Sequence, residues 1–418
     1  MSKPLIGDTE TFVAFRHLNF RRFIFSKFML TLALQIQFVV LSWQVYEITH
    51  DPLSLGFIGL AEAIPAVGLA LYGGYISDRS DRRKILVWVQ ALLIVCSVLL
   101  AYISFHFSSL PLEQQHAFPF YMIMFGVGVL RGFYSPAQFP LMTQLVPREA
   151  YANSSAWNST FWHIAVVLGS SGGGLLLGFC GKNTSYLVVL IVMLLGFIQI
   201  VRIPSQPVQE IKPGEKMMSS IREGLRFVFS NQAILGALSL DLIAVLFGGA
   251  TAMLPVFASD ILQVGEKGFG FLRAAPFAGS VLMALYMTKH PPVKQAGKKL
   301  LFCVGGFSVC MIAFALSRNF YLSLFILAAS GAFDNVSVVI RSMIMQLLTP
   351  DHMRGRVSSV STMFISSSNE IGAFESGFAA KMLGLVPSVI IGGAVALGSV
   401  GAAGAALPEL RKLDLSKA

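Results

Sequence analysis

The sequence predicts an all-α membrane protein with twelve transmembrane helices in two six-helix halves. Three observations lead to this prediction. First, the 418-residue chain is 55% hydrophobic and only 12% charged, with a mean hydropathy of +0.70, whereas a soluble domain carries about 25% charged residues. Second, apolar segments long enough to cross the hydrocarbon core as helices, about 20 residues each, follow one another along the chain. Third, the same motifs recur in both halves in the same order.

The apolar segments, read in chain order, define twelve expected spans. They are residues 22–47, 53–77, 85–107, 118–141, 152–179, 185–203, 231–258, 267–288, 299–317, 320–347, 357–382 and 385–407. The expected domains are a cytoplasmic N-terminal segment (1–21), a first bundle (22–203), a cytoplasmic linker (204–230), a second bundle (231–407) and a cytoplasmic tail (408–418).

The linker is the longest polar interruption. Pro204, Pro207 and Pro213 break helix there. Residues 216–229 then alternate basic and apolar positions at helical spacing, which predicts an amphipathic helix on the membrane surface.

Charge distribution sets the expected orientation. The net charge of +10 is concentrated at the two termini and in alternate loops, as the positive-inside rule requires. This pattern argues against nucleic-acid binding, which needs a basic face on a folded domain. It predicts a multi-pass membrane protein with both termini cytoplasmic. Residues 1–20 carry no apolar core of the kind that a cleaved signal peptide has.

Sequence motifs of enzymes are missing. The chain has no phosphate-binding G-x-x-x-x-G-K-[ST] and no H-E-x-x-H, and its four cysteines lack metal-type spacing. We therefore expect neither an enzyme nor ATP-driven transport, and no metal site or cofactor.

The internal repeat aligns the two halves. Shifted by 211 residues, the segment 59–68 lies on 270–279, so that Glu62 falls on Arg273. Shifted by 203, the segment 128–131 lies on 331–334, so that Arg131 falls on Asp334. At both places, an ionisable residue in one half aligns with a residue of opposite charge in the other half. Each charge at mid-bilayer costs about 2.5–3.5 kcal/mol, so these side chains must face a cavity or each other.

A short basic turn between the second and third spans carries the strongest family signal. Residues 74–84 read Gly-Tyr-Ile-Ser-Asp-Arg-Ser-Asp-Arg-Arg-Lys. The turn resembles the helix 2–3 loop of the major facilitator superfamily, G-x-x-x-D-R-x-G-R-[RK], with Asp81 where the superfamily usually has glycine. The departure is compatible with the branch of enterobactin exporters and macrolide efflux pumps. The matching residues are Gly74, Asp78, Arg79, Arg82, Arg83 and Lys84.

A glycine-rich stretch in the fifth span supports the same resemblance. Gly169, Gly173 and Gly174 resemble the superfamily's antiporter signature G-P-x-x-G-G, with Ser170 in place of the proline. In the superfamily this motif accompanies export, at the contact of helices 5 and 8. The alternative is close helix packing without directional meaning.

The resemblance implies which charges pair. Helices 2 and 4 are neighbours in the superfamily, as are helices 8 and 10, so the expected pairs are Glu62 with Arg131 and Arg273 with Asp334. Separating a pair during transport would change how tightly the carboxylate holds a proton, which offers a route to proton coupling. The alternative is a static ion pair that only fixes packing.

Other polar residues in the spans are weaker candidates. Asp241 is a lone acid in the seventh span, which lines the central cavity in the superfamily, and Glu370 lies in the eleventh. Each could instead be a packing residue. The candidate substrate contacts are Gln35, Trp157, Trp162, His163 and Arg341.

The resemblance implies a proton-coupled transporter of the bacterial inner membrane. It would export an amphipathic organic compound, siderophore or drug-like, by alternating access. The turn from Asp78 to Lys84 would latch the cytoplasmic side against the inner end of the eleventh helix. Expected partners are a small-molecule substrate, protons and the lipid bilayer, with the protein a monomer. Alternatives are a lysophospholipid or metal-ion carrier on the same fold, or a receptor or regulator that does not transport.

Overall fold

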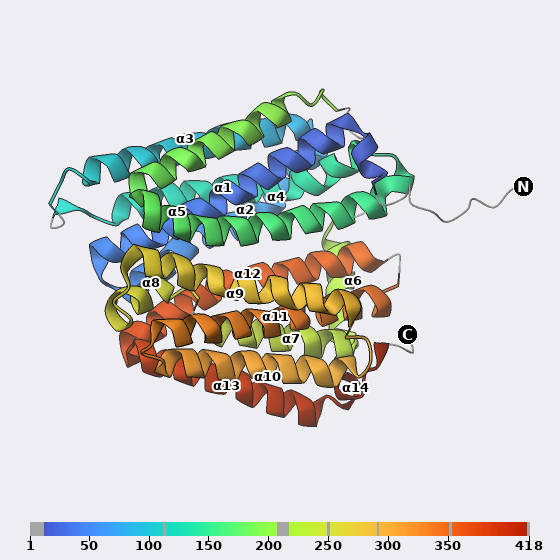
Figure 1. The fold of residues 1–418 in the computed structure, drawn as a ribbon. Coiled ribbons are helices and arrows are strands. Elements are labelled where there is room, and N and C mark those ends of the chain that lie inside the picture. Colours follow the sequence, from blue (N-terminus) through green and yellow to red (C-terminus); the bar gives the residue numbers. More distant parts are fainter. Residues whose placement is uncertain are drawn as a thin grey trace, which may run out of the picture. The chain divides into compact units, whose positions relative to one another are not determined.

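A computed structural model describes residues 12–111, 114–206, 217–248, 251–290, 292–350 and 353–415. Within these ranges the regular secondary structure is helical, and none of these residues lies in a strand (Figure 1). Long helices joined by short turns are what near-continuous apolar segments adopt in a bilayer, because a helix satisfies its own backbone hydrogen bonds.

The first half of the chain contains five long helices. They are α1 (Leu18–Thr49), α2 (Pro52–Arg79), α3 (Arg82–Phe107), α4 (Phe118–Gln144) and α5 (Tyr151–Val201). Two predicted spans, 152–179 and 185–203, form the two arms of α5. The arms meet at Gly181, whose φ of 77° and ψ of 172° are not helical. A side chain is disfavoured at this φ, so glycine is the residue that permits the break.

The second half continues the series. Its helices are α6 (Met217–Ser230), α7 (Gln232–Phe247), α8 (Leu254–Val256), η4 (Phe257–Ile261), α9 (Gly265–Lys289), α10 (Ala296–Leu316), α11 (Phe320–Leu348), α12 (Arg354–Leu383), α13 (Leu385–Ala406) and α14 (Pro408–Arg411). The span expected at 231–258 is interrupted, because α7 ends at Phe247 and the short elements α8 and η4 follow. The helix α6 lies in the stretch expected to be amphipathic.

Eight helices of the described chain are long and apolar enough to cross a membrane, or nine if the bent pair α6–α7 forms one span. One of the eight is the double-length α5. Each of the twelve predicted segments contains helix, and the predicted all-α, twelve-span fold is confirmed.

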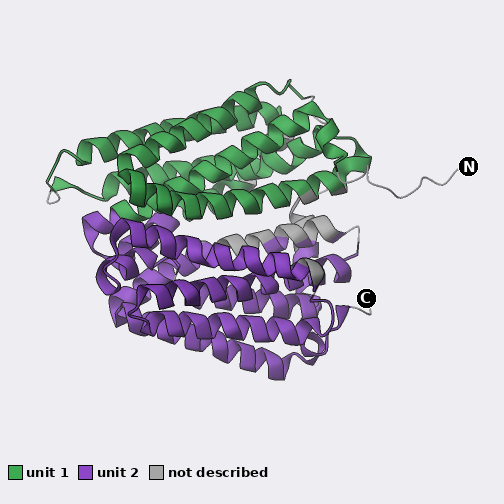
Figure 2. Ribbon diagram, in the orientation of Figure 1, with its two compact units in different colours: residues 1–44, 61–211 green, residues 45–60, 212–418 purple. Residues whose placement is uncertain are grey.

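Two compact units divide the chain by their internal contacts (Figure 2). One comprises Met1–Gln44 and Ala61–Ile211, and the other Val45–Leu60 and Lys212–Ala418. The second unit therefore includes the end of α1, the start of α2 and the turn between them. We call residues 45–60 the hairpin tip.

Each unit has its own apolar core. In the first unit, α3 packs against α4 and α5, and a buried cluster includes Phe20, Phe23, Leu86 and Leu141. In the second unit α11 packs against α9 and α10, α10 against α13, and α7 against α12 (Figure 1). The core there includes Ile234, Leu300, Val304 and Ile340.

The sequence repeat corresponds to matching helix crossings in the two units. In the first, a Cβ at Gly128 of α4 would overlap the carbonyl oxygen of Glu62 in α2. In the second, a Cβ at Gly331 of α11 would overlap the carbonyl oxygen of Pro276 in α9. Gly128 and Gly331 are equivalent by the repeat, and both allow two backbones to approach more closely than any other residue would permit.

A second matched crossing follows the same rule. A Cβ at Gly169 of α5 would lie 2.6 Å from the Cβ of Gln35 in α1, and one at Gly372 of α12 would lie 3.1 Å from the Cα of Leu246 in α7. Gly372 is the repeat partner of Gly169. The two units thus use glycine at corresponding places for corresponding helix pairs.

Candidate functional site

An ion pair joins α2 and α4 inside the first unit. Arg131 donates through Nη1 to Oε1 of Glu62. The glutamate side chain is 8% exposed, whereas that of the arginine is 43% exposed. The backbones are brought together by the close contact at Gly128, one turn before Arg131 on α4. The structure therefore contains the expected Glu62–Arg131 contact, with its carboxylate shielded and its guanidinium open on one side.

The corresponding pair in the second unit does not form, so the expected Arg273–Asp334 pairing is wrong. Arg273 instead donates through Nη1 to the carbonyl oxygen of Thr251 at 3.1 Å. Because α7 ends at Phe247, Thr251 lies beyond the helix and its carbonyl has no place in the helical hydrogen-bond ladder. Arg273 thereby satisfies a backbone acceptor that the broken helix leaves available.

The second unit forms a different pair, between α7 and α11. Arg341 contacts Oδ2 of Asp241 through Nη1, and both side chains are about nine-tenths buried. Its two side chains are less exposed than those of the Glu62–Arg131 and Asp51–Lys381 pairs taken together, since neither is more than 10% exposed. Asp241 and Arg341 were predicted separately, the first as a proton or substrate site and the second as a substrate contact. The structure brings them together.

Asp334 borders the same space. A small cavity of about 20 Å³ is lined by Asp241, Asp334, Ser337 and apolar residues of α7 and α10. Asp334, Ser337 and Arg341 are spaced i, i+3 and i+7 on α11, which places them along one face of that helix. We call Asp241, Asp334 and Arg341 the acid cluster. Its cavity has about the volume that one water molecule needs.

The acid cluster has a definite chemical capacity. It contains two carboxylates and one guanidinium, and Asp241 already shares the guanidinium. Asp334 forms no ion pair with any described residue and is exposed. The cluster therefore has one carboxylate more than it has cations, and one proton on either carboxylate would make its net charge zero.

The basic turn at 74–84 is held by local contacts. The Arg79 guanidinium lies 4.0 Å from the centre of the Tyr75 ring and donates to its hydroxyl. Asp81 caps α3 by accepting from the backbone N–H of Arg83 at 3.0 Å. Its other oxygen accepts from the Ser205 hydroxyl at 2.5 Å. The aspartate that replaces the superfamily glycine thus caps α3 and also binds Ser205, near the C-terminal end of the first unit.

The remaining residues of the turn have mixed positions. Arg83 donates through Nη2 to the carbonyl of Val201 at 2.5 Å. Gly74 and Arg82 are buried, and Lys84 is exposed. The side chains of Asp78 and Glu370 lie outside the described residues. The expected latch therefore stays a prediction.

Two glycines of the fifth span lie close to α1 in the same unit. Cβ atoms at Gly169 and Gly173 would lie within 3 Å of atoms of α1, at Gln35 and Ile36. These two glycines are one helical turn apart, so they lie on one face. The expected contact with the eighth span, which lies in the other unit, stays a prediction. Gly174 is buried.

The candidate substrate contacts are largely engaged within the first unit. Gln35 accepts from the Ser170 hydroxyl at 3.2 Å. Trp157 stacks with Phe12 and meets the edge of Phe15, with ring centres 5.3 and 5.0 Å apart. Trp162 packs against His163, and both are exposed. Trp157 is thus part of an aromatic cluster with the N-terminal segment.

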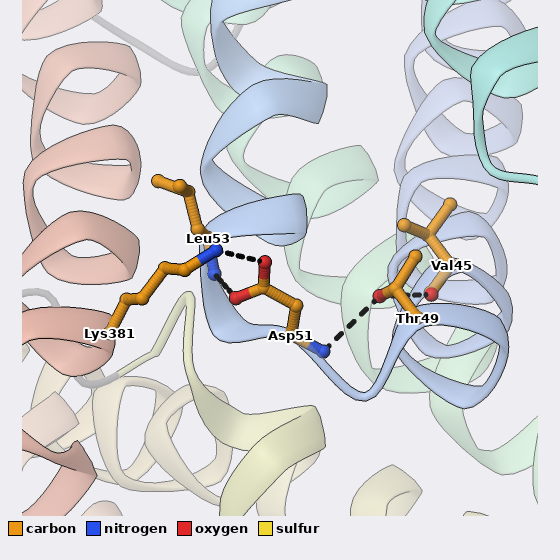
Figure 3. Close-up of polar contacts among 5 residues, drawn as sticks. All are labelled: Val45, Thr49, Asp51, Leu53 and Lys381. Carbon is orange, nitrogen blue, oxygen red and sulfur yellow. Dashed lines mark hydrogen bonds and ion pairs between the residues drawn. The ribbon is translucent and has the colours of Figure 1, made fainter.

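Two side-chain contacts of the hairpin tip, Asp51 with Lys381 and Tyr46 with Asp260, were not expected from the sequence. Lys381 of α12 donates through Nζ to Oδ2 of Asp51 at 2.7 Å, while Oδ1 of Asp51 accepts from the N–H of Leu53 at 3.1 Å (Figure 3). Tyr46 donates to Oδ2 of Asp260 at 2.5 Å. Aspartate directly before Pro52 at a helix start was a visible capping signal. Nothing local in the sequence identifies Lys381 or Asp260 as the partners.

In the part of the chain that the structure describes, no group of three or more His, Cys, Asp and Glu side chains is placed to hold a metal ion.

Repeated six-helix units with ionisable side chains buried between helices define a secondary transporter of the major facilitator class. Solved structures of that class share the fold. The D-xylose-proton symporter matches with a TM-score of 0.66 and 16% identity, covering 97% of this chain and 100% of its own. The nucleoside transporter NupG matches with a TM-score of 0.67 and 12% identity, over 93% and 98%. At these identities the likeness concerns the fold alone.

The chain belongs to the transmembrane secretion effector family, which it matches over residues 9–417. Among curated relatives, the enterobactin exporter EntS of Escherichia coli O1:K1 / APEC is 24% identical over 382 residues, which cover 90% of this chain and 89% of that protein. The EntS protein of Shigella boydii serotype 18 matches to the same extent. The predicted resemblance to the major facilitator superfamily and to its enterobactin-exporter branch is confirmed.

Proposed function

We propose that this protein is a proton-coupled exporter of an amphipathic organic compound, working by alternating access in a bacterial inner membrane with both termini in the cytoplasm. The single observation that carries the coupling is the acid cluster. Asp241 is held by Arg341 while Asp334, on the same cavity, has no cation of its own among the described residues. A site with one carboxylate in excess suits the uptake and release of one proton.

In this proposal the acid cluster exchanges its proton with opposite sides of the membrane in turn. Asp334 takes up a proton when the cluster is reached from outside and gives it up when it is reached from the cytoplasm. Arg341 remains available as the counter-ion, so the cluster never carries two uncompensated charges. The inward movement of protons drives the substrate outward. Glu62 and Arg131 provide a second ion pair, in which the guanidinium is 43% exposed.

The substrate class rests on the relatives. EntS is named as an enterobactin exporter, and the family description concerns transmembrane secretion. We therefore place siderophores first among candidates, followed by macrolides and cationic dyes. The inner-membrane location rests on the bacterial relatives, and the orientation rests on the Lys and Arg distribution.

Purified protein reconstituted in proteoliposomes tests the proposal. Vesicles loaded with each candidate compound receive an imposed pH gradient, and movement of the compound is followed together with the internal pH. We expect movement of one compound against its gradient, coupled to proton movement and abolished by a protonophore. Transport that persists unchanged after the gradient is collapsed would contradict proton coupling, and no movement of any siderophore would contradict the substrate class.

A further inference from the structure

A larger pocket lies in the second unit where α9 ends and α10 begins. Its volume is about 410 Å³. One part of its wall is cationic or polar and the other is apolar. The lining residues are Met283, Tyr286, Met287, His290, Pro292, Lys298, Lys299, Phe302, Cys303 and Val336. A pocket with these two kinds of wall suits a ligand that has a charged head and an apolar tail.

The charged part of the wall favours an anion. Lys298 and Lys299 occupy the first turn of α10 and are both exposed. Within the described residues neither lysine forms an ion pair. His290 is also exposed, and its ring stacks on Tyr286 with the ring centres 4.6 Å apart. Two ammonium groups without carboxylate partners create a positive potential at this end of the pocket.

The apolar part of the wall faces outward from the helices. Phe302, one turn after Lys298 and Lys299, is 70% exposed, and Tyr286 on α9 is 58% exposed. Leu282 and Leu285 of α9 are similarly open, at 69% and 63%. In a membrane-spanning helix, exposed apolar side chains of this kind meet acyl chains. The pocket therefore begins at the level of lipid headgroups and continues into the hydrocarbon region.

We propose that this pocket binds an anionic glycerophospholipid. Its phosphate lies between Lys298 and Lys299, and its acyl chain lies along Phe302 and Met283. Basic pockets between membrane helices are suited to anionic headgroups. A small free anion would use the lysines but leave the apolar wall unfilled. A zwitterionic lipid would fill the apolar wall but present its own cation to the lysines.

The lipid pocket adjoins the acid cluster. Cys303 of α10 lines both the pocket and the small cavity beside Asp241 and Asp334. On α11, Val336 lines the pocket and the next residue, Ser337, lines the cavity. A bound lipid would therefore press on the wall of the acid cluster. This inference concerns binding and does not rest on the proposed substrate or on proton coupling.

Native mass spectrometry of the full-length protein in uncharged detergent tests the proposal. Phosphatidylglycerol and phosphatidylcholine with identical acyl chains are titrated separately, and inorganic phosphate is added as a competitor. We expect saturable binding of phosphatidylglycerol, clearly weaker binding of phosphatidylcholine, and little displacement by phosphate. Equal binding of the two lipids would overturn the proposal. Full displacement by phosphate would also overturn it, because the site would then bind anions without a lipid.

Variants locate the binding. Lys298→Gln with Lys299→Gln should weaken phosphatidylglycerol binding about 30-fold, from the usual contribution of two lysines near a charged lipid surface. Phe302→Ala should weaken binding as well. Lys298→Arg with Lys299→Arg should retain it, which separates loss of charge from loss of folding.

A matched control removes the same charge from the same unit. Arg411→Gln with Lys412→Gln changes two adjacent exposed cations, the last residue of α14 and the residue after it. Neither lines the pocket, although α14 packs against α10. This variant should bind phosphatidylglycerol normally. If it loses as much affinity as the Lys298 and Lys299 variant, the attraction is a general surface effect and the proposed site is wrong.

Discussion

The Asp51 carboxylate serves two elements at once, because one oxygen accepts from Lys381 of α12 at 2.7 Å and the other accepts from the N–H of Leu53 in α2 at 3.1 Å. Both partners lie in the second compact unit, which includes the hairpin tip. The two interactions differ in strength. The Lys381 side chain is 50% exposed and that of Asp51 is 32% exposed, so the ion pair contributes under about 1 kcal/mol.

Substitutions at Asp51 should separate these two interactions. Asp51→Asn keeps a good capping side chain and removes the charge, so we expect only a small fall in the thermal unfolding midpoint. Asp51→Ala also removes the cap and should cost about 1 kcal/mol more. Lys381→Gln should resemble Asp51→Asn. Equal losses for Asn and Ala at position 51 would show that the ion pair, rather than the cap, dominates.

Removal of Arg131 should destabilise the first unit more than removal of its partner. Arg131→Gln leaves the buried Glu62 carboxylate without its cation, and we expect a loss of about 2 kcal/mol, below the range for fully buried pairs because the guanidinium is 43% exposed. Glu62→Gln with Arg131→Gln should lose less than the sum of the single variants. Thermal unfolding of the four proteins completes the double-mutant cycle. Additive losses would mean that the two side chains do not interact.

Neutralising Asp334 should abolish gradient-driven efflux while the protein remains folded. Asp334→Asn keeps the shape of the side chain and removes its proton exchange. Asp241→Asn should also impair transport, with additional loss of stability because Arg341 is left buried without its carboxylate. The control is Glu409→Gln, which neutralises an exposed acid of α14 in the same unit. Normal proton-coupled efflux by Asp334→Asn in proteoliposomes would assign this residue to packing.

Alanine at either matched crossing should destabilise its own unit. Gly128→Ala would place a methyl group against the carbonyl of Glu62, and Gly331→Ala against that of Pro276. We expect each to cost about 1–3 kcal/mol through overpacking. Gly172→Ala is the control, since a Cβ there meets nothing within 4 Å. It should be neutral, or stabilising by about 0.5–1 kcal/mol through helix propensity. Thermal unfolding distinguishes these outcomes, and an unchanged midpoint for Gly128→Ala would contradict the close crossing.

Two aspartates of the basic turn should respond differently to the same change. We propose that Asp78 acts in the cytoplasmic latch, so Asp78→Asn should slow turnover without changing substrate binding. Asp81→Asn should leave turnover close to normal, because asparagine caps a helix almost as well as aspartate. Transport rates and equilibrium binding are measured on both variants. Normal turnover by Asp78→Asn would remove the latch role.

The helices could be predicted closely because their signal is local and repeated. A run of apolar residues bounded by charges specifies a span wherever it falls, and the Gly128 and Gly331 motifs could be aligned from the sequence alone. The break after Phe247 was missed because the apolar run continues through it. Gly181 was not singled out, although it lies in the gap between two expected spans, 152–179 and 185–203.

The pairing of charges was predictable only in part. Glu62 and Arg131 meet because α2 and α4 are neighbours, which the resemblance implied. The same reasoning failed for Arg273 and Asp334. The sequence did show that Asp334 and Arg341 lie two turns apart on one helix face, so both could be assigned to the same site. It contained no information on the distance from Arg341 to Asp241, because partners from different helices are chosen by the packing of the whole unit.

The repeated glycine crossings give this transporter an internal standard for mutagenesis. Each half supplies a counterpart for a position in the other, on an equivalent backbone but with different surrounding chemistry. The same substitution made at both counterpart positions separates effects on folding stability from effects on transport. Equal losses of transport would point to the shared helix packing, and unequal losses would identify the half that takes part directly in transport.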